Sequence, residues 1–255
     1  MNLSYRIYYV FLRNLISYKR FIIPTFVVSL GQPLFYLVTF GLGMGAYMGH
    51  FGGKPYLHFL VPGVLISSVM MAATFECLYG TFVKIVHEHL YDSLVATPVS
   101  AEDAVAGDIA WASFRGLISG TLMLIIAMAL GVLPASWTAL PALVLLMIFT
   151  GLLFASLAMI VTSVAPNFDF FSYYTELIIT PMFFFSGVFF PLDRFPAWMQ
   201  TFAQFLPLTH AVALSRALFA GEISSALLIH IAALCALGTV AFVVGIKRMK
   251  KRLIT

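Results

Sequence analysis

The chain has 255 residues, of which 62% are hydrophobic and only 9% are charged, and its mean hydropathy is +1.01. A soluble domain carries about 25% charged residues, so this composition excludes a water-soluble globular protein and is typical of a polytopic membrane protein. The net charge is +4, and both cysteines, Cys77 and Cys235, lie in apolar runs, so no disulfide framework is implied. We therefore predict an all-α polytopic membrane protein, with residues 1–255 in a single transmembrane domain.

Residues 1–20 are predicted to form an amphipathic helix at the membrane interface. Arg6, Arg13 and Arg20 recur every seven residues. The apolar side of the same helix holds Ile7, Val10, Phe11 and Leu15. A helix of this kind lies flat in the headgroup layer, so we expect its arginines to face lipid phosphates and the cytosol. The alternative is that this stretch is only the polar start of the first membrane span.

Six apolar segments are long enough to cross a bilayer, which takes about 20 residues. Small residues at a four-residue spacing, such as Gly116 and Gly120, predict close approach between neighbouring helices. With the N-terminus inside, ten lysines and arginines fall on the cytoplasmic side and three on the outer side. The positive-inside rule therefore predicts that both termini are cytoplasmic. The predicted spans are residues 21–47, 57–83, 109–132, 138–164, 170–190 and 223–246.

Residues 84–109 join the second and third spans and hold five of the ten acidic residues. So many acidic residues in so short a segment indicate a loop in water. The same count of lysines and arginines places this loop on the cytoplasmic side. Within it, residues 87–96 have the pattern of a short amphipathic helix. Its apolar side holds Leu90, Tyr91, Leu94 and Val95, and its polar side holds Glu88, Asp92 and Ser93. Such a helix can contact something outside the bilayer.

The residues after this short helix predict where it ends and where the next one begins. Thr97 precedes Pro98, and the residue before a proline is disfavoured in a helix, so the short helix should end there. Ser100 followed by Asp103 is typical of an N-cap, which would start the next helix well before its apolar run near Ile109.

Residues 191–222, after the fifth span, are too apolar for a free loop and are interrupted by Pro191, Pro196 and Pro207. We expect two short helices here, near residues 196–205 and 207–220, because helical hydrogen bonding would satisfy the backbone in an apolar setting. They would dip into the outer leaflet as re-entrant helices or pack on the tops of the spans.

Three ionisable residues, Glu76, Arg115 and Glu176, fall inside predicted spans. Counting from the nearest charged residue at the cytoplasmic end of each helix, all three lie roughly 10–12 Å inside it. An unpaired charge at that depth is costly, so we expect the arginine to pair with one or both carboxylates in an intramembrane charge layer. The alternative is that the helices extend into the cytosol and these groups are simply hydrated at the interface.

Several kinds of catalytic or metal site are missing from the sequence. A phosphate-binding loop needs G-x-x-x-x-G-K-[ST], and around Lys54 neither the first glycine nor the final hydroxyl is present, so nucleotide hydrolysis is not expected in this chain. His87 and His89 are two apart, which does not place them on one helix face, so no metal site is expected. No hydrolase motif of the form G-x-S-x-G or H-E-x-x-H occurs.

Two stretches carry distinctive motifs. The loop reads E-x-x-x-D-S-L-x-A-T-P-V-S over residues 88–100, and the late block F-F-F-S-G-V-F-F-P-L-D-R-F-P with P-L-T-H-A-V-A-L-S-R-A-L-F covers residues 183–219. Together they resemble the type-2 ABC exporter permeases. Within that family the chain is most similar to the NodJ-like permeases of lipo-oligosaccharide exporters. The resemblance implies a multi-pass subunit of the cell inner membrane that works as a homodimer with two copies of a separate ABC ATPase. It also implies no cofactor in this chain, because ATP and Mg would be held by the ATPase, and no nucleic-acid partner.

The resemblance also implies roles for the short cytoplasmic helix and the outer helices. Residues 87–96 would be the coupling helix, which fits a groove on the ATPase. Glu88 and Asp92 would offer carboxylates to a basic groove. The buried anchor in that groove would be Leu90, Tyr91 and Leu94. The family's re-entrant outer helices would correspond to residues 196–220.

Aromatic residues at the end of the fifth span could line a path for the substrate, entering laterally from the membrane. They are Phe183, Phe184, Phe185, Phe189 and Phe190. Ordinary core packing or lipid contact is the alternative for them. The resemblance suggests an amphiphilic cargo such as a lipo-oligosaccharide, glycolipid or polysaccharide. A drug exporter of the same family, an ion-coupled secondary transporter, a membrane enzyme and a structural anchor are the other hypotheses, and Glu76, Arg115 and Glu176 keep the ion-coupled one open.

Overall fold

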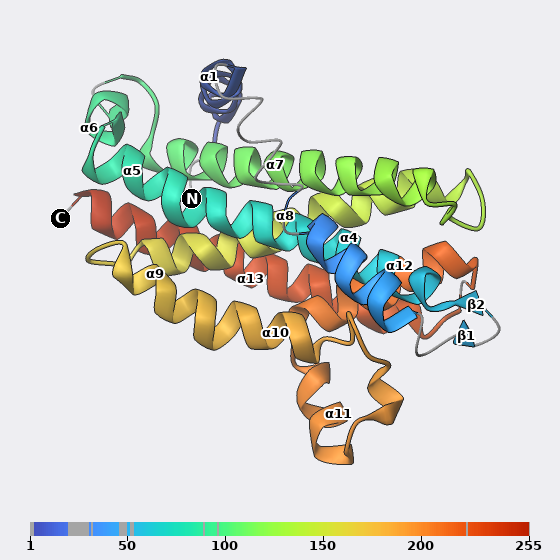
Figure 1. The fold of residues 1–255 in the computed structure, drawn as a ribbon. Coiled ribbons are helices and arrows are strands. Elements are labelled where there is room, and N and C mark those ends of the chain that lie inside the picture. Colours follow the sequence, from blue (N-terminus) through green and yellow to red (C-terminus); the bar gives the residue numbers. More distant parts are fainter. Residues whose placement is uncertain are drawn as a thin grey trace.

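The computed structural model describes residues 3–19, 31, 33–45, 50–51, 54–88, 90–95, 97–222 and 224–254. In this part of the chain, long helices run side by side as a bundle (Figure 1). Four helical rods are long and apolar enough to cross a membrane. They are α4 (Tyr56–Phe75), which continues through η3 (Glu76–Gly80) and α5 (Thr81–Val86), then α7 (Ala101–Ala129), α8 (Ala139–Thr162) and α13 (Leu227–Ile254). The predicted helical membrane fold is thus confirmed at this level; the strands described are β1 (His50–Phe51) and β2 (Lys54–Pro55), which pair antiparallel.

The four rods correspond to the second, third, fourth and sixth predicted spans. The fifth is a shorter continuous rod made of α9 (Asp169–Tyr174), η4 (Thr175–Ile179) and α10 (Thr180–Phe185). Much of the first predicted span, residues 21–47, lies outside the described residues, and its described part includes η2 (Leu37–Met44). The six-span count therefore stays a prediction.

The bundle has two distinct ends (Figure 1). The short helix α6 (Leu90–Val95) and the C-terminus lie at one end, which we call the α6 end. The β1–β2 pair lies at the other end, which we call the β end. Every crossing rod runs between these two ends.

Helix α7 begins at the predicted cap. Ser100 Oγ accepts a hydrogen bond from the Asp103 backbone N–H at 3.0 Å, and the Asp103 carboxylate accepts one from the Ser100 N–H at 3.4 Å. This reciprocal capping box satisfies two backbone N–H groups that a helix start leaves without partners. Because the cap precedes the apolar run, α7 carries Asp103 and Asp108 into its first turns.

Close approach between α4 and α7 depends on two glycines, as the small-residue spacing predicted. A Cβ atom at Gly116 would lie 2.9 Å from the Val69 carbonyl oxygen, and one at Gly120 would lie 2.6 Å from Val69 Cγ2. Neither separation is sterically allowed, so the two helix backbones can be this close only because side chains are absent there. By contrast, α13 lies at the periphery of the bundle, because only 11% of its most apolar 18-residue stretch is buried.

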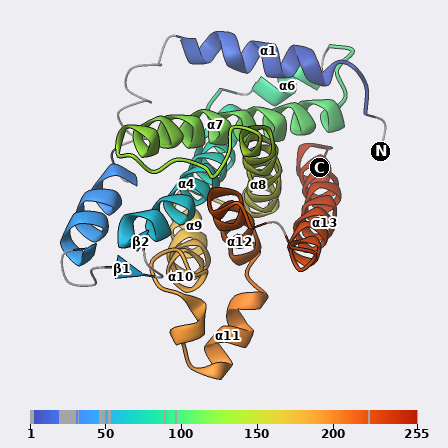
Figure 2. The ribbon, with the colours of Figure 1, turned by 90° about the vertical axis from the view of Figure 1, so that its right-hand side faces the viewer.

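Helix α1 (Ile7–Tyr18) lies across the bundle rather than along it, and Figure 2 shows it lengthwise above α6 and α7. A Cβ atom at Gly107 would lie 2.6 Å from Val10 Cβ, so α1 is pressed against the α7 backbone. Phe11 adds edge-on contacts with Trp111 and Phe114, with ring centroids 5.8 and 5.4 Å apart.

Two of the three arginines expected to face lipid phosphates and the cytosol have partners within the protein, and the third, Arg20, lies outside the described residues. Arg6 donates a hydrogen bond to the Pro98 carbonyl oxygen, and Arg13 donates one to Asn14 Oδ1 at 2.9 Å. The exposed surface of this N-terminal segment is instead aromatic and apolar, formed by Tyr5, Tyr8, Tyr9 and Ile16. The amphipathic pattern located the apolar face correctly, but acceptors within the protein bind Arg6 and Arg13.

The segment after α10 forms the two predicted short helices, α11 (Ala197–Gln204) and α12 (Pro207–Ala220), preceded by η5 (Leu192–Arg194). Helix α11 projects away from the bundle (Figure 2). Helix α12 packs on α4, where Ser215 Oγ donates to the Pro62 carbonyl oxygen at 3.1 Å.

Candidate functional site

Helix α6 is joined to α7 through a buried phenol. Tyr91 is 2% exposed, and its hydroxyl donates a 2.6 Å hydrogen bond to Asp108 Oδ2. Asp108 itself is 1% exposed. Burial and the neighbouring Asp108 carboxylate raise the pKa of Tyr91 well above its ordinary value, so the phenol keeps its proton and remains a donor.

The other carboxylate oxygen of Asp108 faces groups from two further elements. Asn14 Nδ2 of α1 donates to Oδ1 at 2.6 Å, and Lys84 Nζ of α5 donates to it at 3.0 Å. The Arg13 guanidinium lies 3.8 Å from the same oxygen. We call these five residues the Asp108 cluster: Arg13, Asn14, Lys84, Tyr91 and Asp108. A buried carboxylate needs such partners, because an isolated charge would not be tolerated there.

The structure places the predicted coupling residues in different environments. Glu88 is exposed and Leu90 is partly exposed, so both can meet a partner. Leu94 packs partly against the core. The side chain of Asp92 lies outside the described part of the structure.

The structure corrects the prediction that Tyr91 belongs to the anchor for the ATPase. We expected it to point into a groove on another protein, but it is buried inside the permease. The reason is that its hydroxyl has a charged acceptor in Asp108, which periodicity alone could not reveal.

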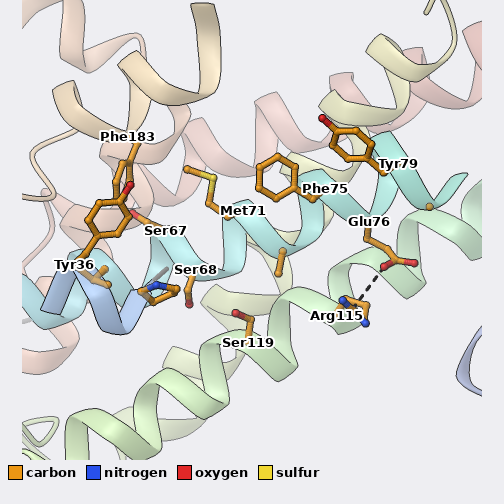
Figure 3. A pocket seen from close by; sticks show the side chains of 14 residues that line it. Tyr36, Ser67, Ser68, Met71, Phe75, Glu76, Tyr79, Arg115, Ser119 and Phe183 are labelled. Atoms are coloured by element: carbon orange, nitrogen blue, oxygen red, sulfur yellow. Dashed lines mark ion pairs between the residues drawn. The ribbon is translucent and has the colours of Figure 1, made fainter. Parts of the chain in front are cut away.

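A pocket of about 290 Å³ lies between the helical residues 33–36, just before η2, and the elements α4, η3, α7 and α10 (Figure 3). Tyr36 and Phe183 stand at one end of it, and Glu76 and Arg115 at the other. Its wall between these ends includes Ser67, Ser68, Met71, Phe75, Tyr79 and Ser119. The pocket therefore combines aromatic surface, hydroxyls and an ion pair, the mixture expected where a ligand with apolar and polar parts binds.

Glu76 and Arg115 form an ion pair on the pocket wall, with Arg115 Nε 3.6 Å from Glu76 Oε2. Trp111 Nε1 donates to Glu76 Oε1 at 2.8 Å, and the guanidinium lies 4.6 Å from the ring centroid of Tyr18 on α1. Glu76 also begins a π-helical turn, since the Thr81 N–H bonds to its carbonyl five residues earlier. Such turns recur at functional sites.

Glu176 is not brought to this pair. It lies in a second π-helical turn, η4, and is exposed. Among the residues that the structure describes, no ion pair of Glu176 is found. The predicted layer of three charges is thus one pair and a separate carboxylate.

The five phenylalanines do not form one surface. Phe183 lines the pocket, and Phe184 is 39% exposed. Phe185 and Phe190 are half-buried. Phe189 is fully buried among other rings, with Phe40 at 4.5 Å and Phe183 at 4.9 Å between centroids. The prediction of a substrate-facing stripe is therefore wrong for Phe189, because aromatic packing occupies its whole side chain.

Sequence reasoning missed the residues that hold these regions together. Asp108 counted only as a marker of the helix end, although an acid within a buried helical turn calls for partners. The sequence did not indicate that Asn14 and Lys84 would contact Asp108, because these contacts depend on tertiary packing. Ser67, Ser68 and Ser119 are ordinary in membrane helices, so only the pocket singles them out.

No cluster of three or more histidine, cysteine, aspartate or glutamate side chains able to hold a metal ion occurs within the described residues. His210 and His230 do approach each other, with 2.7 Å between their Nδ1 atoms, and link α12 to α13. Of the pair that the sequence raised, His87 stacks on Phe168 at 5.7 Å between centroids, and His89 lies outside the described residues.

Comparison with known proteins identifies the family. A model of the ABC-2 type transporter family matches residues 5–220. The chain is 35% identical over 243 residues to nodulation protein J of Sinorhizobium fredii, covering 95% of this chain and 92% of the relative. It is 36% identical over 241 residues to nodulation protein J of Rhizobium leguminosarum bv. viciae, covering 94% and 92%. It is also 25% identical over 195 residues to the inner membrane transport permease YadH of Escherichia coli, covering 76% and 75%.

The chain therefore belongs to the ABC-2 type transporter family. It is a membrane protein and a transport permease, whose family works with separate ATPase subunits, so a partner of that kind is implied.

Proposed function

We propose that this chain is the membrane subunit of an ATP-driven exporter that moves an amphiphilic substrate out of the cytoplasm or the inner leaflet. The substrate class we favour is a lipo-oligosaccharide, glycolipid or polysaccharide. Similarity to the nodulation proteins J over almost the whole chain supports this choice. Export of a small hydrophobic drug by the same machinery is the alternative.

The observation that carries the proposal is α6, a short helix set between two membrane-length rods at one end of the bundle (Figure 1). Glu88, just before this helix, has an exposed carboxylate, and Leu90, its first residue, has a partly exposed side chain. An acidic group beside an apolar one fits a basic groove with an apolar floor. We propose that two ATPase copies, which hold ATP and Mg, dock here on a dimer of this chain.

Binding of the ATPase tests the proposal. The chain is purified together with the candidate ATPase, and Glu88→Lys combined with Leu90→Asp should release it, because the charge is reversed and the apolar contact is lost. Glu222→Lys is the matched control, since Glu222 is also exposed but is separated from α6 in sequence by α7, α8 and the rod from α9 to α10. Binding unaffected by the α6 changes, or lost equally in the control, would contradict docking at α6.

The pocket is the proposed contact site for part of the substrate. Its volume of about 290 Å³ suits one sugar unit or a segment of acyl chain rather than a whole lipo-oligosaccharide. Aromatic faces at Tyr36 and Phe183 would take the apolar part, and the serines and ion pair the polar part. The amphiphile would enter between the helices from the membrane.

Filling the pocket should reduce export. Ser119 lines it and is 2% exposed, so Ser119→Phe would occupy the space without changing any charge. We expect export to fall at least tenfold, because a factor of that order corresponds to the binding free energy lost with the pocket contacts. ATPase binding should be retained. Ser136→Phe, in the loop before α8, is the control. Export measured in vesicles at wild-type rate for Ser119→Phe would remove the pocket from the substrate path.

A further inference from the structure

We propose that Asp108 is a positioning residue for transport: it fixes the coupling helix α6 and ties it to α1, so that a displacement of α6 moves α1 as well. This inference rests on the proposed function and adds to it the part of the permease that receives the movement first. The Asp108 cluster brings together four elements that are separate in sequence, namely α1, α5, α6 and α7.

Helix α6 cannot hold its own position. It has six residues, whereas isolated helices shorter than about 12 residues are marginal in water. Tertiary contacts must therefore fix it, and the 2.6 Å bond from Tyr91 to Asp108 is a charge-assisted one in a buried setting. Leu94 supplies apolar packing beside it.

The same carboxylate holds α1. Asn14 donates to Asp108 at 2.6 Å, and a second acid of α7, Asp103, accepts bonds from Ser4 N at 2.7 Å and Ser4 Oγ at 3.0 Å. Arg6 reaches the Pro98 carbonyl in the linker that follows α6. The N-terminal segment is thus bonded to α7 and to the linker between α6 and α7.

Helix α1 continues this contact towards the pocket. Four residues beyond Asn14 in the sequence, Tyr18 lies under the Arg115 guanidinium at 4.6 Å, and Arg115 pairs with Glu76 on the pocket wall. A continuous set of contacts therefore joins α6 to the pocket by way of α1. Contact alone does not prove coupling, so the test must measure coupling directly.

The experiment uses the full complex with its ATPase and reads out ATP hydrolysed per substrate exported. Tyr91→Phe removes only the hydroxyl and leaves Lys84 paired with Asp108. We expect about tenfold more ATP used per substrate moved, the order of effect of one hydrogen bond to a charged group, with ATPase binding unchanged. Asn14→Leu, which removes the α1 bond, should give a loss of the same order. Tyr8→Phe, on the exposed side of the N-terminal segment, is the matched control and should behave as wild type.

A double variant separates positioning from general damage. If Tyr91 acts through Asp108, Tyr91→Phe with Asp108→Asn should be no worse than Asp108→Asn alone, whereas independent roles would multiply. If Asp108→Asn does not yield folded protein, the ATP used per substrate exported by Tyr91→Phe and by Asn14→Leu tests the inference. Wild-type coupling in both, or multiplied effects in the double variant, would overturn the inference. Failure of the wild-type chain to bind any ATPase would instead refute the proposed function.

Discussion

Arg115 carries a positive charge into an apolar helix, and Glu76 and the ring of Tyr18 lie against it. Both members of the ion pair are largely enclosed, with side-chain exposures of 15% and 18%. Removing one member of such a pair leaves the other poorly solvated, which costs more than the pair itself contributes.

Arg115→Leu should therefore destabilise the protein by about 2 kcal/mol, below the 3–5 kcal/mol of a fully buried pair. Glu76→Gln in the same chain should restore part of the loss, because the remaining carboxylate no longer needs a cation. Glu176→Gln should not, since Glu176 is exposed and lies in another rod. Thermal unfolding in detergent measures all three; equal rescue by both glutamines would show that the pairing is not as described.

At individual residues, periodicity predicts which face of a helix is apolar but not what that face meets. Tyr91 shares its helix face with Leu90 and Leu94, so the sequence could not show that its hydroxyl reaches Asp108 inside the permease. Arg13 was assigned to lipid phosphates for the same reason, although the nearest anion is Asp108. In both cases the partner is more than 15 residues away in sequence.

Among the helices, α12 contacts the turn after α10 through the cation of Arg216. The Arg216 guanidinium donates hydrogen bonds to the Gly187 and Val188 carbonyls and lies 3.7 Å from the ring centroid of Phe59. It thereby satisfies carbonyls in the turn after α10, where Gly187 has a φ of +79° that most residues avoid.

Arg216→Lys should loosen α12, because an ammonium cannot reproduce the planar fork that reaches two carbonyls while stacking on a ring. We expect a loss of about 1.5–3 kcal/mol, the range for hydrogen bonds to a charged group, seen as a lower unfolding temperature and faster proteolysis around residues 191–222. Arg194→Lys, an exposed arginine of η5, is the control and should unfold as wild type does. An unchanged unfolding temperature for Arg216→Lys would mean that the other contacts of α12 hold it without the guanidinium.

Helix boundaries were more predictable where a local signal sets them. The Ser100 cap, Pro196 before α11 and Pro207 at the start of α12 act on the residues beside them, so these starts could be predicted from the sequence. The π-helical turns at η3 and η4 have no comparable sequence signal, and they were not predicted.

For the whole molecule, the arrangement of rods predicts which loops share a side of the membrane. If both termini are cytoplasmic and six spans cross, residue 88 is cytoplasmic and residue 222 is outside. In a background with Cys77→Ser and Cys235→Ser, Glu88→Cys should react with a membrane-impermeant maleimide only after the cells are opened, whereas Glu222→Cys should react in intact cells. Labelling of Glu88→Cys in intact cells would exclude an ATPase partner at α6.

The wide turn at η3 has a consequence for every residue that follows it in the same rod. One extra residue per turn changes the angular phase of the downstream helix by about 100°. Ordinary winding of the same sequence would therefore carry Lys84, and with it the entrance to α6, to a different side of the bundle. Removing one residue between Glu76 and Gly80 would restore ordinary winding and keep Lys84 on its present side, because the wide turn takes up the extra residue. The orientation of Lys84 and of the entrance to α6 is therefore set by a single residue taken up in a wider turn at the wall of the pocket.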